Sequence, residues 1–190
     1  MSILRGFEPC RLHIMKIGHS LWLTPEDKSQ TVLSELISKL AKKHQSPIFP
    51  PHVTLIGLSF LGQLGQKKSI DAATKLSKLS PPLKLDLGNI DYSTTYFQCL
   101  FARINATPQL MNLYLESEKH YEREPKMYMP HLSLLYGDID MESRHRLAQS
   151  TSLPISTVTF DTLTVVKFDL DNMDPTTWKI VDQKQLQNNN

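Results

Sequence analysis

The chain has 190 residues, of which 40% are hydrophobic and 21% are charged, a composition typical of a folded globular protein. This composition excludes a coiled-coil rod, a collagen and a long disordered chain. The 21 basic and 19 acidic side chains give a net charge of +2. So small an excess does not favour long-range capture of nucleic acid, although local groups could still bind a small anion.

The ends of the chain and its cysteines predict a compartment. No segment approaches the roughly 20 consecutive apolar residues that cross a bilayer, so we expect no membrane association. The only cysteines are Cys10 and Cys99, fewer than a secreted disulfide scaffold uses, which favours the cytoplasm. Residues 1–18 lack the apolar core of a secretion signal and are predicted to form an extension.

The first half of the chain alternates strand and helix patterns. Thr24 and Pro25 resemble a helix start, because threonine caps helices and proline suits the first helical position. Pro50 and Pro51 end that helix. The predicted elements are a strand at Ser20–Leu23, a helix from Thr24 through Leu40, a strand at His52–Leu58, a loop at Gly62 and Gly65, and a helix from Ile70 to Leu79.

The second half repeats the alternation and completes one domain over residues 19–182, followed by a frayed polar tail at 183–190. Thr107 with Pro108, and Asp140, are predicted to cap two helices. The predicted strands are Leu83–Leu87, Tyr96–Ile104, His131–Tyr136, Val158–Val166 and one from Trp178 to Val181. The chain thus predicts roughly eight strands and four helices, an α+β domain with two lobes.

Two segments share one pattern, Pro-His-apolar-hydroxyl-Leu. They are Pro51-His52-Val53-Thr54-Leu55 and Pro130-His131-Leu132-Ser133-Leu134. On a strand, residues two apart point to the same face, so each histidine projects with its hydroxyl partner. The two strands could therefore place two imidazoles and two hydroxyls around one cleft.

This set of groups suits hydrolysis of a phosphodiester by water. One imidazole would accept a proton from water, the other would protonate the leaving oxygen, and the hydroxyls would hold the phosphoryl oxygens. Histidine serves both proton roles because its ordinary pKa is about 6.5. A single His-apolar-Thr pattern is more often a partly buried structural histidine, so the duplication carries the functional hypothesis.

The paired motifs resemble the signature of the two-histidine (2H) phosphoesterase superfamily, and within it the plant and yeast type of cyclic phosphodiesterase. The similarity spans about Ser20 to Val181. Its most specific segment is Tyr128–Tyr136, which reads YMPHLSLLY. The other similar segments are Ser20–Trp22, Pro50–Thr54, Tyr96–Cys99 and the region of Trp178.

The resemblance implies a two-lobed fold in which each lobe is an antiparallel sheet with helices outside and the active-site groove lies between the lobes. It implies metal-free, cofactor-free hydrolysis of ADP-ribose 1″,2″-cyclic phosphate, a compound formed downstream of tRNA splicing, to ADP-ribose 1″-phosphate. Nucleoside 2′,3′-cyclic phosphates, opened to 2′-phosphates, would be further substrates. The protein would act as a monomer on small molecules, without a stable nucleic-acid partner.

The resemblance also assigns residues. His52 and His131 become the catalytic pair, and Thr54, Ser133, Trp22 and Tyr136 contact the substrate. Strict alternation would turn Tyr136 away from His131, so it reaches the groove only if the strand bends or ends near Leu135. The sequence does not decide whether Trp22 lies in the groove or in the hydrophobic core.

Two other functions and one role assignment stay open. The chain could be an RNA-end enzyme of the same superfamily, a 2′–5′ ligase or terminal cyclic phosphate phosphodiesterase, or a non-catalytic nucleotide-binding module. We favour His131 as the base and His52 as the acid, although near symmetry allows the reverse, with both groups titrating near pH 6 to 7.5. Asp138 and Asp140 near His131 do not have the spacing of a metal site, so no metal is expected.

Overall fold

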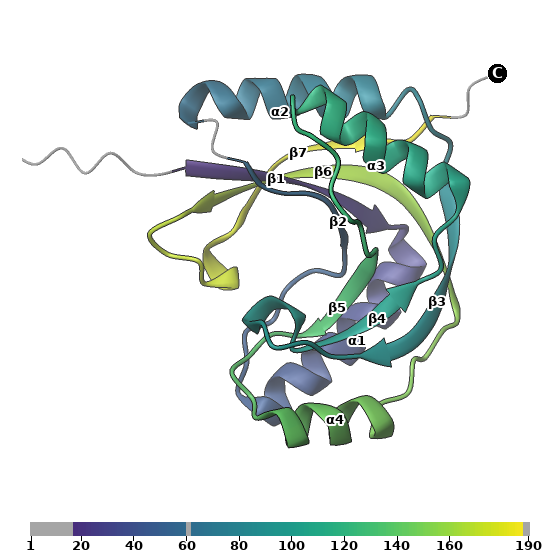
Figure 1. Cartoon of the computed structure of the whole chain (residues 1–190), viewed down its shortest axis with the longest axis vertical. Coiled ribbons are helices and arrows are strands. Elements are labelled where there is room, and N and C mark those ends of the chain that lie inside the picture. Colours follow the sequence, from purple (N-terminus) through teal and green to yellow (C-terminus); the bar gives the residue numbers. More distant parts are fainter. Residues whose placement is uncertain (1–16, 60–61, 188–190) are drawn as a thin grey trace, which may run out of the picture.

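The structure, a computed structural model, describes residues 17–59 and 62–187, so most of the predicted extension and Cys10 lie outside the described residues. This part of the chain forms seven strands and four α-helices (Figure 1). The strands are β1 Ile17–Pro25, β2 Val53–Ser59, β3 Leu83–Asp91, β4 Leu100–Ile104, β5 His131–Leu135, β6 Thr157–Asp169 and β7 Lys179–Gln185. The helices are α1 Asp27–His44, α2 Gly62–Leu76, α3 Pro108–His120 and α4 Met141–Ser150, with 3-10 turns η1 Tyr96–Gln98 and η2 Pro175–Thr177.

All seven strands belong to one sheet, in the order β1-β2-β5-β4-β3-β6-β7, and every pairing is antiparallel. Because β1 also pairs with β6, the first six strands of this order close into a ring. The expectation of a separate sheet in each lobe was therefore wrong. The bridge of β2 to β5 and the long strand β6, which reaches both β1 and β3, join the strands into one curved surface.

The helices contact different parts of this sheet (Figure 1). α2 packs against β1, β6 and β7, and α3 against β2 and α2. α4 packs against β3 and β4, whereas α1 lies against β5 and β1. One large core runs between helices and sheet, and it includes the fully buried side chains of Leu21, Leu23 and Leu163. Because side chains alternate along a strand, the residues between these leucines face the other side of the sheet, which we call the inner face.

Two of the three predicted helix starts are confirmed. The side chains of Thr107 and Asp140 accept hydrogen bonds from the backbone N–H groups of Leu110 and Ser143, as helix caps do. Thr24 does not cap α1, because β1 continues through Pro25. Its hydroxyl is instead bonded within the sheet, to the carbonyl oxygen of Thr162 at 3.2 Å.

Two predicted elements differ from the structure. The loop placed at Gly62 and Gly65 belongs to α2, and the strand placed at Tyr96–Ile104 begins with the η1 turn. Sequence patterns do not predict glycines inside a helix or a turn at the start of a strand, because tertiary packing overrides weak local propensity.

The ends of the domain also differ from the expectation. Residues 17 and 18 were expected to be part of the extension. They belong instead to β1 and pair with β6. Residues 183–185, expected in a frayed tail, belong to β7 and pair with β6. The strand continues there because Leu186 is buried and its N–H donates to the carbonyl oxygen of Asp161. Among the described residues, no helix is long and apolar enough to cross a membrane.

A buried arginine organises the loops around the inner face. Arg144 on α4 is 4% exposed, and its guanidinium donates to four backbone carbonyl oxygens at 2.5 to 3.0 Å. These carbonyls belong to Ser93, Thr95, Gly137 and Ile139. Arg144 thereby ties the segment before η1 to the segment after β5.

We predict that Arg144→Met lowers the free energy of unfolding by about 3 kcal/mol. The substitution keeps an unbranched apolar stem but leaves four carbonyl groups, in buried or partly buried positions, without their charged donor. Urea denaturation measures the change. Arg146→Met on the same helix, which removes an exposed pair with Glu142 and an exposed hydrogen bond to Ser143, should change it by less than about 0.5 kcal/mol. Equal effects of the two substitutions would contradict this role.

Candidate active site

The two histidine motifs meet where β2 pairs with β5. The contact is a single residue pair, Val53 with Leu132, and both side chains are fully buried in the core. The residues on either side of each therefore project to the inner face. In this antiparallel register His52 lies beside Ser133, and Thr54 lies beside His131. The four side chains singled out by the duplicated pattern thus share one face of adjacent strands.

Both imidazoles are oriented by the same kind of contact, a hydrogen bond from Nδ1 to a backbone carbonyl oxygen. The Nδ1 atom of His52 lies 2.7 Å from the carbonyl oxygen of Pro50, and Nδ1 of His131 lies 3.0 Å from that of Met129. A carbonyl oxygen only accepts, so each Nδ1 carries the proton. In the neutral ring Nε2 is then the free basic atom. In both motifs, the residue two positions before the histidine thus selects the tautomer.

His52 is buried and strongly biased towards its neutral form. It is 5% exposed and stacks on the Trp22 indole, with ring centroids 3.6 Å apart. Burial lowers the pKa of His52 to about 4; the hydrogen bond to Pro50 opposes this shift, and the charge of His131 adds to it. At neutral pH, His52 is therefore an unprotonated imidazole with a free Nε2.

His131 is biased in the same direction by partly different groups. Burial lowers its pKa, the hydrogen bond to the Met129 carbonyl raises it, and the Arg103 guanidinium lowers it again. Arg103 pairs with His131 across β4 and β5, so both point to the inner face. The Gln98 amide nitrogen lies 3.4 Å from Nε2 of His131, a contact in which an amide N–H can donate to the bare ring nitrogen.

The two motif hydroxyls differ in their present partners. Ser133 donates its proton to the carbonyl oxygen of Phe97 at 3.1 Å. Thr54 is half-buried on the wall of a cavity beside His52. Thr54 is thus placed towards a ligand beside His52, whereas Ser133 must turn from Phe97 to donate to one.

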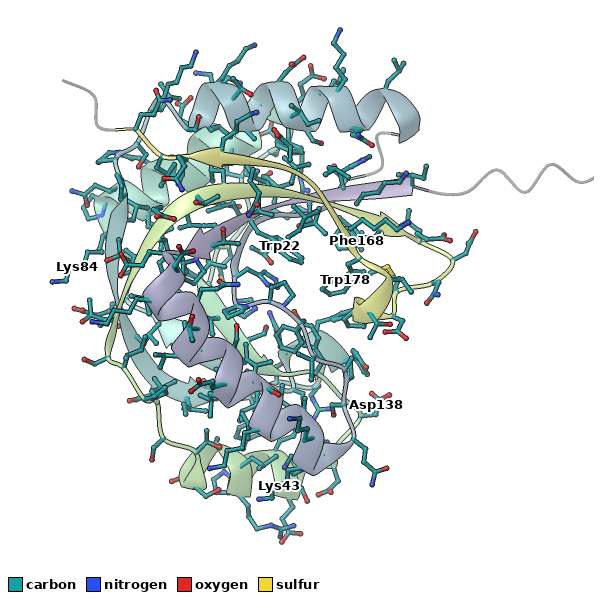
Figure 2. All side chains as sticks on the ribbon, turned by 180° about the vertical axis from the view of Figure 1, so that it is seen from behind. Trp22, Lys43, Lys84, Asp138, Phe168 and Trp178 are labelled. Atoms are coloured by element: carbon teal, nitrogen blue, oxygen red, sulfur yellow. The ribbon has the colours of Figure 1, made fainter. Side chains whose placement is uncertain are left out.

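The cavity beside His52 has a volume of about 130 Å³. Phe97 and Tyr136 line it. So do Trp22 and Trp178, which are labelled in Figure 2. His131 and Ser133 are not part of its wall; they lie on the neighbouring strand β5. The structure therefore brings His52, Thr54, Trp22 and Tyr136 to one cavity, with the second motif at its side.

Tyr136 and Trp22 reach the cavity in different ways. β5 ends at Leu135, so Tyr136 is no longer held to the alternation of the strand. Its ring stacks on Phe49 with centroids 3.6 Å apart. Trp22 keeps the alternation of β1, and at 2% exposure it packs with Val166 and Phe168 while its face covers His52. It is therefore both a packing residue and part of the cavity wall.

Sequence patterns did not single out Gln98 or Arg103. Arg103 is held by Asp91, which accepts from Nη2 at 2.6 Å and from Nε at 2.8 Å. A single arginine on a strand carries no motif, and only the register of β4 against β5 places it beside His131.

Comparison with known proteins places this geometry in a family. Residues 15–183 match the model of the cyclic phosphodiesterase-like protein family. The chain is 26% identical over 174 residues to the cyclic phosphodiesterase of Arabidopsis thaliana, covering 88% of this chain and 94% of that protein. The chain belongs to the cyclic phosphodiesterase-like family of 2H phosphoesterases. Membership supports a phosphodiesterase that hydrolyses cyclic phosphates in general.

Solved structures support the fold. The family member described here superimposes on TT0787 of Thermus thermophilus with a TM-score of 0.62, at 16% identity over 89% of this chain and 97% of that one. It superimposes on Escherichia coli LigT in complex with 3′-AMP with a TM-score of 0.56, at 15% identity over 91% of this chain and 99% of that one. Within residues 17–59 and 62–187, no three histidine, cysteine or acidic side chains cluster closely enough to hold a metal ion.

We predict that Arg103→Gln raises the pKa of His131, because the substitution removes a neighbouring positive charge that disfavours the imidazolium. Arg103→Lys keeps the charge and should leave the pKa closer to that of the wild type. NMR titration of the imidazole C–H signals measures both variants. An unchanged or lower pKa of His131 in Arg103→Gln would refute the electrostatic coupling.

Proposed function

We propose that this protein hydrolyses ADP-ribose 1″,2″-cyclic phosphate to ADP-ribose 1″-phosphate, and nucleoside 2′,3′-cyclic phosphates to 2′-phosphates, by two-histidine acid–base catalysis without a metal. One observation carries the proposal. Both motif histidines project from adjacent strands to one face with Nδ1 held by a backbone carbonyl, which makes Nε2 the basic atom of each ring; that of His131 lies 3.4 Å from the Gln98 amide nitrogen.

The reaction needs one proton acceptor and one proton donor. A neutral imidazole takes a proton from water as the water oxygen attacks phosphorus. The bond from phosphorus to one ring oxygen then breaks, and the second imidazole, as imidazolium, gives that oxygen its proton. The product is a phosphomonoester beside a free hydroxyl, and the two histidines have exchanged protonation states.

Burial favours an assignment opposite to the one expected from sequence. The base must be neutral, and His52 has its pKa lowered to about 4 in a buried site against Trp22. His131 is the less buried of the two and lies beside Gln98 on the more open side of the pair. We therefore assign the base to His52 and the acid to His131, which the anionic substrate would help to protonate.

The neutral donors of the site suit the phosphoryl oxygens. Thr54 faces the cavity beside His52, and the Ser133 hydroxyl can turn towards it from the Phe97 carbonyl. Tyr136 stays protonated because burial raises its pKa well above the usual range, so its hydroxyl can donate. Such donors stabilise the charge that develops on the non-bridging oxygens.

Several further expectations remain proposals that rest on the resemblance and the sequence. These are a monomer, action on small molecules without a stable nucleic-acid partner, a position downstream of tRNA splicing, and the cytoplasm as compartment. A turnover assay that includes an RNA substrate separates the proposed enzyme from an RNA-end enzyme and from a non-catalytic nucleotide-binding module.

We predict turnover of ADP-ribose 1″,2″-cyclic phosphate and of 2′,3′-cyclic mononucleotides in the presence of EDTA, because the two imidazoles supply both proton transfers. Phosphate-ester products separated by ion-exchange chromatography measure the rates. A short RNA with a terminal cyclic phosphate is the comparison substrate. Preference for the RNA would favour the RNA-end enzyme, activity restored only by a divalent ion would place the site in the metal-assisted class, and binding without turnover would indicate a binding module.

We predict that kcat/KM follows a bell-shaped pH profile on the acid side of 6.5, because it reports the free enzyme and both motif histidines have lowered pKa values there. The rising limb belongs to deprotonation of His52 near pH 4, and the falling limb to loss of the proton from His131. Removing either histidine should reduce turnover by roughly 10²- to 10⁴-fold.

A substrate with a good leaving group distinguishes the acid from the base. A nitrophenyl phosphodiester needs no acid, so the His131→Ala variant should regain turnover on this substrate, whereas the His52→Ala variant should not. His145→Ala, an exposed histidine of α4, is the matched control and should match the wild type on both substrates. Recovery of His52→Ala instead would reverse the two roles.

A further inference from the structure

The inner face of the sheet continues past the histidines towards β7. Trp22 and Thr24 pair with Thr164 and Thr162 of β6. These threonines pair in turn with Gln183 and Gln185 of β7. Two cross-strand rows of side chains therefore run from the β2 motif to the amides of β7. Nothing in the reaction proposed above uses the β7 end of these rows.

A cavity of about 570 Å³ lies over this end. Trp22 lines both this cavity and the one that contains His52, so the indole stands between them. Pro50, whose carbonyl holds His52, also contributes to the wall. Ile180, which is 52% exposed, adds an apolar surface. The size is that of a small-molecule site.

The hydrogen bonds of the cavity floor have a definite direction. Thr24 donates its one proton to the Thr162 carbonyl, so in its 3.0 Å contact with Thr164 the donor is Thr164. The Thr164 oxygen is then free to accept from the Gln183 amide nitrogen at 3.2 Å. Likewise Gln185 donates to Thr162, which donates to Asp161.

Each of the two glutamine amides thus donates one N–H to a threonine of the sheet, and its carbonyl oxygen is left to accept a hydrogen bond from a ligand in the cavity. Gln30 also lines it and has a buried carbonyl oxygen without a hydrogen-bond partner. Asp161 adds a carboxylate to this wall, as do Glu26 and Asp27, against one cation, Lys28. The cavity is therefore rich in acceptors and carries negative charge, which suits a ligand with hydroxyl and amino donors and disfavours a phosphate.

We propose that this cavity binds the uncharged nucleoside end of the substrate, through its ribose hydroxyls and the amino group of its base. The inference rests on the proposed cyclic phosphodiesterase function. From β2 to β7 there are three strand spacings, roughly 14 Å along the sheet. A diphosphate linker can bridge such a distance, whereas a cyclic mononucleotide held at His52 ends too soon. The cavity therefore makes the enzyme selective for ADP-ribose 1″,2″-cyclic phosphate over 2′,3′-cyclic mononucleotides.

The test removes the two acceptors on the β7 strand. In the double variant Gln183→Leu/Gln185→Leu, KM for ADP-ribose 1″,2″-cyclic phosphate should rise roughly five- to thirty-fold, as expected for two lost hydrogen bonds. KM for adenosine 2′,3′-cyclic phosphate should stay the same. Both glutamines are exposed on the last strand, so the variant is expected to fold, which its thermal unfolding curve checks. Gln149→Leu, at an exposed position of α4, is the matched control and should change neither KM.

A binding measurement keeps this test separate from the proposed reaction. ADP-ribose, which has no cyclic phosphate to hydrolyse, is titrated calorimetrically into the wild type and the double variant. Weaker binding to the folded double variant supports the cavity even if no cyclic phosphate is turned over. Absent binding to the wild type, equal binding to both proteins, or an equal rise in KM for both substrates overturns the proposal.

Discussion

The site depends on one backbone contact, the pairing of Val53 with Leu132. It is the only register pair between β2 and β5, and it joins two segments far apart in the sequence. Because both side chains are buried in the core, a slip of one residue would expose them and bury His52 and Thr54, or His131 and Ser133. The hydrophobic effect that sets the core register thereby sets the positions of the two histidines.

The surroundings of the two motif histidines are unsymmetrical. Each histidine donates to the backbone carbonyl two residues before it, Pro50 for His52 and Met129 for His131, yet their surroundings differ. His52 is 5% exposed and stacks on Trp22, whereas His131 is less buried and pairs with Arg103. Two nearly identical motifs thus occupy different environments, and in the proposed reaction this difference separates their proton roles, because desolvation penalises a charge on His52 most.

Aromatic side chains replace charges in the wall beside His52. Trp22, Phe97, Tyr136 and Trp178 approach it from β1, η1, the end of β5 and the segment before β7, and none of them carries a formal charge. Such a wall lowers the local dielectric and strengthens the effect of the few polar groups present. The buried Arg144 supports this arrangement indirectly, because it fixes the loops that carry Phe97 and Tyr136.

The sequence by itself determined the motif residues, the order of most elements and the family. Duplicated His-x-hydroxyl patterns, helix caps at Thr107 and Asp140, and two-residue alternation are local features, so they are readable without coordinates. Local patterns also explain the errors. Thr24 has the composition of a cap, yet its hydroxyl bonds across strands to Thr162, and Gly62 and Gly65 lie in a helix despite their low propensity.

Only the tertiary structure decided how the motifs meet and what surrounds them. Sequence suggested two sheets, but the bridge of β2 to β5 and the long strand β6 make one closed sheet. The partners of the histidines illustrate the same limit. Arg103 and Gln98 reach His131, and Trp22 covers His52, through contacts between residues tens of positions apart. Non-local register and burial fix those contacts, and with them the pKa values of the histidines, because both depend on the packing of the whole chain rather than on neighbours in sequence.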